Sequence, residues 1–363
     1  MLSIVLADDT RSYDGRSLET EPLGGTESSV IRFARALAQR GHEVTCFTNC
    51  AAPIEHEGVR WVPLSHPKPE RCDVYIPVQH VRLFGLVRRP KRMVVWVLWQ
   101  PNEYKHYKKL PLFWAYRPIP LLMSHHQRRI CSPLLPRRSP HVIIPLGLPD
   151  DIRGLPPLGE PPPPQAIFAS NPQRNLAPLV RIWAERIFPR RPDAILNVYG
   201  LHGIGAGEDA WQRWAGSLLP AGIPEAAQRS VRIHPTAPRE QLMTAIRRSR
   251  AMLYLGHKVE AFCLTVAEAQ AMGVPCVVAP ETVLPERVID GVTGCVRGDP
   301  QAFADAALDL FNDDALWRRQ HEAALRLQQG ISWAEYAYRF EAALLSDMLP
   351  AHAIAPPSGL QAR

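Results

Sequence analysis

The sequence has no long apolar run and no paired cysteine motif. These absences argue against a membrane-spanning protein and against a disulfide-rich one. No window approaches the roughly 18 consecutive apolar residues that a membrane-spanning helix requires. The seven cysteines contain no C-x-x-C pair, and their odd number argues against a complete disulfide framework. The apolar N-terminus is short and lacks a basic region, so we expect no signal peptide. We therefore expect a cytoplasmic protein, either soluble or peripheral to a membrane.

The length and composition favour a globular protein with an anionic partner. A chain of 363 residues is enough for two domains of about 150 residues each, and its 46% apolar content can fill two cores. Lysine and arginine (42) exceed aspartate and glutamate (35), which gives a net charge of +7. A positive charge of this size suits nucleotide phosphates, acidic lipid surfaces or nucleic acid, and composition alone does not choose among them.

The first half alternates short apolar runs with helical patterns, as parallel β-α-β units do. One helix is predicted at Thr26–Arg40, where the apolar residues recur at helical spacing. Strands are predicted at Ser3–Ala7, Glu43–Thr48, Val59–Leu64, Val74–Val78, Met93–Leu98 and Val142–Pro145.

A proline-rich segment, roughly Pro149–Pro164, interrupts this rhythm, which then restarts. Strands are predicted at Ala166–Ala169, Ala194–Tyr199, Val231–His234, Ala251–Leu255 and Val274–Val278, and helices at Leu176–Ile187, Arg239–Arg250, Thr265–Met272, Gln301–Asn312 and Trp317–Gln329. An amphipathic segment ends the pattern at about 333–349. We expect an α/β fold with two Rossmann-like domains, residues 1–147 and 148–332, that face each other across a cleft, with the terminal helix returning to the first domain. Open α/β sheets bind ligands at the carboxyl ends of their strands.

The segment from Glu260 to Ala269 carries two glutamates eight positions apart, one in a predicted loop and one in a predicted helix. Thr265 and Glu268 have the spacing of a capping box, in which each side chain satisfies a backbone N–H of the helix start. The same helix N-terminus could instead hold a diphosphate, with Glu268 accepting the hydroxyls of a ribose and Glu260 facing a sugar. The residues alone leave both interpretations open.

This segment resembles the E-x7-E motif of the family 4 retaining glycosyltransferases, which have the GT-B fold. The likeness runs through the chain in order, which makes it specific. It includes Gly24-Gly-Thr-Glu27, Leu37-Ala-x2-Gly-His-Glu-Val44, Ile144-Pro-Leu-Gly147, Ser170-Asn-Pro-Gln-Arg174, Glu260-Ala-Phe-Cys-Leu264, Glu268-Ala-Gln-Ala-Met-Gly-Val-Pro275 and Pro285-Glu-Arg-Val-Ile-Asp-Gly-Val-Thr-Gly294.

The resemblance implies roles for individual residues. Glu260, Arg174 and His80 would be the catalytic residues: Glu260 would contact the donor sugar, Arg174 would neutralise the departing diphosphate, and His80 would lie near the transferred sugar. A histidine is more often structural, and His80 keeps both interpretations. The donor would also contact Gly24, Gly25, Lys258, Phe262, Cys263, Leu264, Thr265 and Glu268, the last as the ribose ligand.

The chain also departs from the family pattern. Many members have a lysine about five residues after the arginine, where this chain has Pro178-Leu179, and Lys258 is a candidate to replace it. Gln100 stands where relatives commonly have a histidine, and an amide cannot act as a general base. We identify no D-x-D motif or carboxylate cluster at a predicted strand end, so we expect no metal and no other cofactor.

Two stretches, residues 82–92 and 105–114, mix cations with large apolar side chains. They are either a solvated face beside the core or a membrane-contacting surface that presents a lipid-linked acceptor. No recognition module accompanies the charge, so nucleic acid is not an expected partner. The expected activity is transfer of a sugar, with retention, from a nucleotide diphosphate-sugar to a glycan, polysaccharide or lipid-linked hydroxyl. The alternatives are a non-catalytic binding module and a sugar-nucleotide epimerase.

Overall fold

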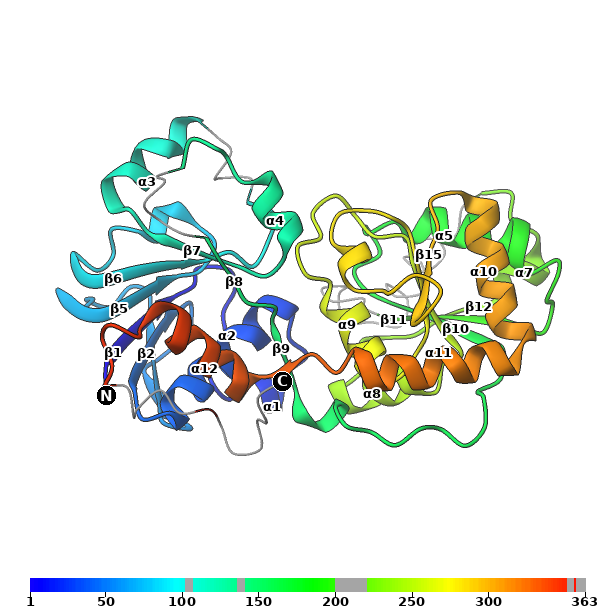
Figure 1. Ribbon diagram of the computed structural model, residues 1–363, viewed down its shortest axis with the longest axis horizontal. Coiled ribbons are helices and arrows are strands. Elements are labelled where there is room, and N and C mark those ends of the chain that lie inside the picture. The colour runs from blue at the N-terminus through cyan, green and yellow to red at the C-terminus, as the bar shows by residue number, and fades with distance from the viewer. Residues whose placement is uncertain (102–106, 136–140, 200–220, 351–355, 357–363) are drawn as a thin grey trace. The chain divides into compact units, whose positions relative to one another are not determined.

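The computed structural model describes residues 1–101, 107–135, 141–199, 221–350 and 356. The chain divides into two compact units (Figure 1). Unit 1 comprises Met1–Gly147 together with Ile331–Arg363, and unit 2 comprises Leu148–Gly330. The chain therefore leaves unit 1 once and re-enters it once. The two crossings are paired as short strands, β9 (Gly147–Leu148) and β16 (Ile331–Ser332).

Unit 1 is built on an eight-stranded sheet in the order β3-β4-β2-β1-β5-β6-β7-β8. Only the β3–β4 pair is antiparallel. The strand order changes direction at β1, so the crevice between the carboxyl ends of β1 and β5 is where an open α/β sheet holds a ligand. The strands are β1 (Ser3–Ala7), β2 (Glu43–Thr48), β3 (Ile54–His56), β4 (Val59–Pro63), β5 (Arg71–Pro77), β6 (Arg89–Trp96), β7 (Ile119–Leu122) and β8 (Val142–Ile143).

The last helix of the chain, α12 (Trp333–Leu344), packs against α2 (Gly25–Gln39), as Figure 1 shows. The ring of Phe33 meets those of Tyr336 and Phe340 edge to face, with centroids 5.0 and 5.1 Å apart. Edge-to-face contacts of this kind stabilise beyond the area that they bury. The expected return of the C-terminal helix to the first domain is confirmed. The other helices of unit 1 are α1 (Ser17–Thr20), α3 (Leu110–Tyr116) and α4 (His125–Ile130), with 3-10 turns at Val81–Leu83 and Tyr107–Lys109.

An ion cluster fastens the same helix. Glu341 is 1% exposed, and its two carboxylate oxygens accept from Arg40 Nε and Nη2 at 2.5 and 2.6 Å. His42 Nε2 lies 3.0 Å from the same carboxylate, and its Nδ1 accepts from the backbone N–H of Leu2. Burial raises the pKa of Glu341, but the hydrogen bonds from His42 and Arg40 outweigh it and hold the pKa below its ordinary value.

Unit 2 has a six-stranded, wholly parallel sheet in the order β12-β11-β10-β13-β14-β15. Its direction changes at β10, so the ligand crevice lies between the carboxyl ends of β10 and β13. The strands are β10 (Gln165–Ala169), β11 (Ile195–Tyr199), β12 (Val231–Ile233), β13 (Ala251–Tyr254), β14 (Cys276–Val278) and β15 (Gly294–Val296). The helices are α5 (Leu176–Ile182), α7 (Glu225–Ser230), α8 (Arg239–Arg247), α9 (Leu264–Ala271), α10 (Pro300–Asn312) and α11 (Asp314–Leu327), with 3-10 turns at Asp150–Ile152 and Leu284–Glu286.

Some local elements differ from the predictions. The predicted helix Leu176–Ile187 is α-helical only to Ile182, and the remainder, Trp183–Ile187, is a π-helix. Strand β7 was not predicted; it contains Pro120, and proline cannot donate to a strand ladder. Pro120 nevertheless lies opposite Val95 in a parallel pair. The α/β fold class itself is confirmed.

Candidate functional site

The loops that follow β10 and β13 are joined by side-chain contacts at the ligand crevice of unit 2. Arg174, after β10, donates from Nη1 to Glu260 Oε1 at 2.6 Å, and Glu260 follows β13. Asn175 donates from Nδ2 to the backbone carbonyl of Gly256 at 2.7 Å. The structure therefore brings together Arg174 and Glu260, two of the three residues predicted to be catalytic.

Glu260 is a buried carboxylate with an arginine and a tyrosine hydroxyl as partners. Its side chain is 3% exposed, whereas that of Arg174 is 38% exposed. The hydroxyl of Tyr254, the last residue of β13, donates to the same oxygen, Oε1. Burial in turn raises the pKa of Tyr254 well above its ordinary value. The sequence analysis did not single out Tyr254, and a tyrosine that ends a strand just before a loop carboxylate was the available signal.

Helix α9 begins one turn after Glu260, and it does not begin with a capping box. Its first residue is Leu264 and its N-cap is Cys263, which has left-handed backbone angles (φ 63°, ψ 71°). Thr265 lies inside the helix, so its hydroxyl is not at the N-cap position that a capping box requires. The capping interpretation of Thr265 and Glu268 was therefore wrong. Phe262 and Cys263 are buried, and Leu264 and Thr265 are half-buried.

Glu268 forms an ion pair with Arg239 of α8, a contact that was not predicted from the sequence. Its Oε1 accepts from Arg239 Nη1, at the start of α8, at 2.8 Å. The carboxylate is 15% exposed. Its role as a ribose ligand stays a prediction, and Arg239 would orient it for that role.

Lys258 and Arg287 are the other cations considered beside Arg174. Lys258, predicted to replace the missing lysine, is exposed on the loop before Glu260. Arg287, which follows the 3-10 turn at Leu284–Glu286, lies over the ring of Phe262 with its Cζ 4.5 Å from the centroid. Its Nε is buried and has no hydrogen-bond partner among the described residues. Burial lowers the pKa of Arg287.

At the crevice of unit 1, His80 is held by a carboxylate. Its Nδ1 lies 2.6 Å from Asp9 Oδ1, and Arg82 Nε donates to the other oxygen of Asp9. Asp9 follows β1 and His80 follows β5. The statement that no carboxylate cluster follows a predicted strand was wrong, because Asp8 and Asp9 come directly after Ser3–Ala7. This adjacent pair was the missed signal.

Gly24 and Gly25 form the start of α2, where Gly24 is the N-cap. A Cβ atom on Gly24 would lie 2.6 Å from Glu27 Oε2, so the glycine makes room for a carboxylate. Burial raises the pKa of Glu27. A contact of these glycines with phosphate stays a prediction. Gln100 lies in the same unit, where its Nε2 is 3.3 Å from His126 Nε2.

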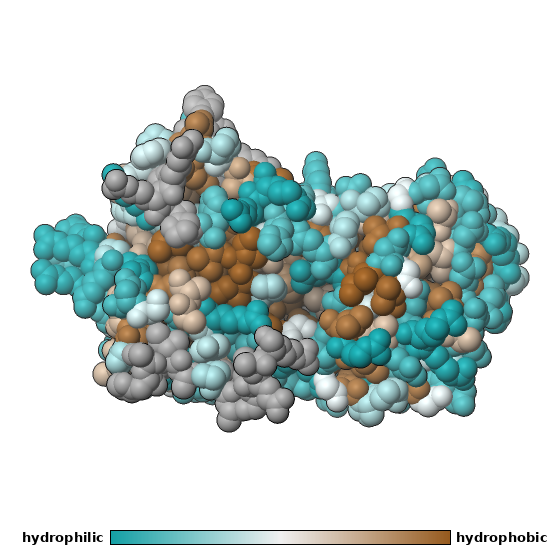
Figure 2. Space-filling model, viewed as in Figure 1, coloured by the Kyte–Doolittle hydropathy of each residue, from teal (hydrophilic) through white to brown (hydrophobic). Residues whose placement is uncertain are grey.

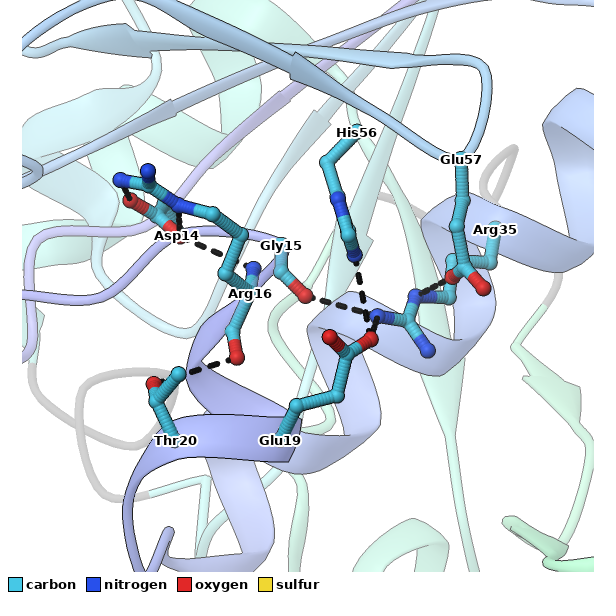
Figure 3. A network of polar contacts seen from close by, with 8 residues as sticks. All are labelled: Asp14, Gly15, Arg16, Glu19, Thr20, Arg35, His56 and Glu57. Carbon is cyan, nitrogen blue, oxygen red and sulfur yellow. Dashed lines mark hydrogen bonds and ion pairs between the residues drawn. The ribbon is translucent and has the colours of Figure 1, made fainter.

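Within the described residues, one group has the composition of a metal site: Glu19, His56 and Glu57 in unit 1. Figure 3 shows that the guanidinium of Arg35 lies between the two carboxylates. Arg35 also donates to the backbone carbonyl of Gly15 at 2.7 Å. An arginine therefore already occupies the position of a cation, and we assign no metal there.

Part of the chain matches a known protein family. Residues 188–326, most of unit 2, match the family model for glycosyl transferases group 1. Through this segment, which is under half of the chain, the protein is similar to the group 1 glycosyl transferases. The matched segment contains both Glu260 and Glu268, whereas Arg174 and His80 lie before it in the chain.

Curated proteins similar to this chain include D-inositol 3-phosphate glycosyltransferases. The protein from Corynebacterium aurimucosum is 33% identical over 168 residues, which cover 45% of this chain and 38% of that protein. The protein from Streptomyces avermitilis is 35% identical over 126 residues, which cover 33% and 27%. The chain thus matches well under two thirds of the length of these relatives.

Solved structures show the same GT-B fold. HepE from Anabaena, solved in complex with UDP-glucose, superposes with a TM-score of 0.69 at 14% identity, over 95% of this chain and all of that one. Sucrose-phosphate synthase from Thermosynechococcus elongatus gives a TM-score of 0.68 at 16% identity, over 95% and 99% of the two chains. At these identities the likeness establishes the fold alone.

Proposed function

We propose that this protein transfers a glycosyl group from a nucleotide diphosphate-sugar to an acceptor hydroxyl. The observation that carries the proposal is the Arg174–Glu260 pair beside the N-terminus of α9. A diphosphate-sugar has an anionic half and a hydroxyl-bearing half joined by one bond. A guanidinium and a carboxylate in contact match the two halves in chemistry.

Charge determines which residues would bind the diphosphate of the donor and which would bind its sugar. The helix N-terminus carries partial positive charge and free N–H groups, which attract a diphosphate. Arg174 adds a full charge whose N–H fork fits phosphate oxygens. Glu260 is an acceptor of hydrogen bonds, and so it suits sugar hydroxyls. As the bond to the sugar breaks, negative charge grows on the diphosphate, and groups placed to stabilise it lower the barrier.

The test is donor hydrolysis and transfer with UDP-, GDP- and ADP-sugars, starting with UDP-glucose because HepE was solved with it. We expect E260Q and R174A each to lower turnover by about 10²-fold or more. E322Q, in an exposed position on α11, is the matched control. Wild-type activity in both site variants would refute the assignment.

We further propose that transfer retains the anomeric configuration and needs no metal. In such a reaction a diphosphate oxygen takes the proton of the acceptor hydroxyl on the face from which the diphosphate leaves. Proton NMR of the first product formed would show the retained anomer, and an inverted product would exclude this route. Activity that disappears with EDTA and returns with Mg²⁺ would contradict metal independence. A binding module would shift in thermal melting with a nucleotide but turn nothing over.

The acceptor is proposed to be a glycan or lipid-linked hydroxyl, with a peripheral membrane contact through unit 1. Within the described residues, no helix is both long and apolar enough to cross a bilayer. Trp114 on α3 and Leu134 are 53% and 63% exposed. Figure 2 shows hydrophobic residues gathered in patches between hydrophilic ones on the face that it draws. Residues 105 and 106 of the predicted basic stretch 105–114 lie outside the described residues. Co-sedimentation with anionic vesicles, lost in W114A, would support the contact, and equal sedimentation with neutral vesicles would oppose an electrostatic one.

A further inference from the structure

The start of the proline-rich segment lies on the surface of unit 2 and is bonded there by side chains. Residues 153–158, here named the strap, form neither a helix nor a strand, so their backbone groups need other partners. Three side chains supply them, from α8, from α11 and from just after α11 (Figure 1). The bonds join Gly154 N–H to Gln329 Oε1 (2.5 Å), the carbonyl of Pro156 to Arg247 Nη2 (2.6 Å) and Leu158 N–H to His321 Nε2 (2.9 Å).

The same three side chains also hold the C-terminal end of α9. Three consecutive carbonyls there are buried, and a buried carbonyl requires a hydrogen-bond partner. The carbonyl of Ala271 accepts from Gln329 Nε2 (2.9 Å), that of Met272 from Arg247 Nη1 (3.0 Å) and that of Gly273 from His321 Nδ1 (2.6 Å). Each side chain therefore bridges one carbonyl at the end of α9 and one residue of the strap, in the same order along both segments.

The bridge at His321 accepts only one form of the imidazole. A carbonyl can only accept and a backbone N–H can only donate, so Nδ1 carries the proton and Nε2 has the lone pair. The ring is 1% exposed and stacks on Trp317 with centroids 4.5 Å apart, and burial lowers the pKa of His321. A Cβ atom on Gly273 would lie 2.6 Å from Nδ1, so the contact also requires the glycine.

Helix α9 has little else to fix its position along its own axis. Helices pack by fitting ridges of side chains into grooves, and methyl groups form low ridges. Of its five buried residues, three are alanines, at positions 267, 269 and 271. At the other end the N-cap is Cys263, which has no side-chain oxygen with which to cap the first N–H groups. The C-terminal end is therefore the anchored end of the helix.

We propose that Gln329, Arg247 and His321 are positioning residues, which fix α9 along its axis against the strap. The proposal rests on the proposed function, in which the N-terminus of α9 binds the donor diphosphate. A helix of eight residues is about 12 Å long, and it moves as a rigid body, so a shift at Ala271 displaces Leu264 equally. A misplacement of about 1 Å can lower turnover by about 10²-fold. The strap thus acts on the donor through α9.

The first test measures the position of α9 and needs no turnover. R247M removes both bonds of one bridge, and R248M is its matched control, because Arg248 is the next residue and is exposed. The amide ¹H–¹⁵N NMR signals of Leu264 and Thr265, at the opposite end of α9, should shift in R247M and not in R248M. Q329A and its neighbour Q328A form a second pair, which decides the matter if R247M does not fold. Signals that stay unchanged in every folded bridge variant would overturn the proposal.

The second test measures the affinity of the folded protein for a nucleotide. Isothermal titration calorimetry is run with whichever of UDP, GDP and ADP binds the wild type most tightly, well below the Tm of every variant. R247M and Q329A should bind it about tenfold more weakly, the size of one hydrogen bond to a charged group, and R248M and Q328A should not. A purely structural role would lower Tm alone, so equal affinity in all five proteins would overturn the positioning role. If none of the three nucleotides bound the wild type, the proposed function would be refuted instead, and the NMR signals would still decide whether the bridges fix α9.

Discussion

Cys263 permits a stability prediction that isolates backbone strain. Its φ of 63° is in the left-handed region, and the side chain is 7% exposed at the N-cap of α9. For a residue with a Cβ this conformation costs about 1–2 kcal/mol, and glycine gives back about 0.5–1 kcal/mol through its greater freedom when unfolded. C263G and C263A both remove the sulfur, so the loss of its burial cancels between them. C263G should therefore be about 1 kcal/mol more stable than C263A, or about 2–4 °C in Tm for a unit of this size.

The assay is urea unfolding followed by circular dichroism, with C263G and C263A compared at equal m-values. Ala267, within α9, provides a control of opposite sign, because A267G introduces flexibility at a helical φ and should destabilise by about 1 kcal/mol. Equal stability of C263G and C263A, or a more stable C263A, would show that the left-handed conformation carries no strain.

Three further predictions address charge. E341Q should lower the free energy of unfolding by about 3 kcal/mol at pH 7, since it breaks a buried ion pair. Because the folded pKa of Glu341 is lowered from 4.5, this difference should be full above about pH 4.5 and shrink as the pH falls through the folded pKa. Acid unfolding that ran parallel in both proteins would contradict it. Y254F removes one donor to the Glu260 carboxylate and should destabilise by about 1.5–3 kcal/mol in calorimetry, the range for bonds to charged groups. R287M should raise the donor KM more than K258A does, since Arg287 lies on Phe262 and Lys258 is exposed; the reverse order would favour the lysine.

The strands that the sequence predicts best are those whose apolar runs have clear limits. Ser3–Ala7 and Glu43–Thr48 match β1 and β2 residue for residue, because each run is buried and ends at polar residues. The pattern failed where a local preference was overridden, as at Pro120 in β7. It failed again at Thr265, because α9 starts earlier than the motif indicates, at a residue in a conformation that its type disfavours.

The site was predictable in its residues but not in its contacts. The order of motifs along the chain pointed to Arg174 and Glu260, and the structure places them 2.6 Å apart. The partners Tyr254 and Asp9 were not foreseen. Asp9 and His80 are 71 positions apart, and only the parallel pairing of β1 with β5 brings their strand ends together. Such a pairing is a property of sheet order, which no local pattern contains.

The attachment of α12 to unit 1 has a consequence for synthesis. Phe33 and Trp96 are 0% exposed, and Tyr336 packs on both. A ribosome makes these two residues early and their cover last, after all of unit 2. The unit encoded first is therefore completed last, and until then it presents an aromatic surface to chaperones and proteases. A stop codon at Ile331 or Ser332 would leave unit 2 whole and unit 1 permanently in that unfinished state.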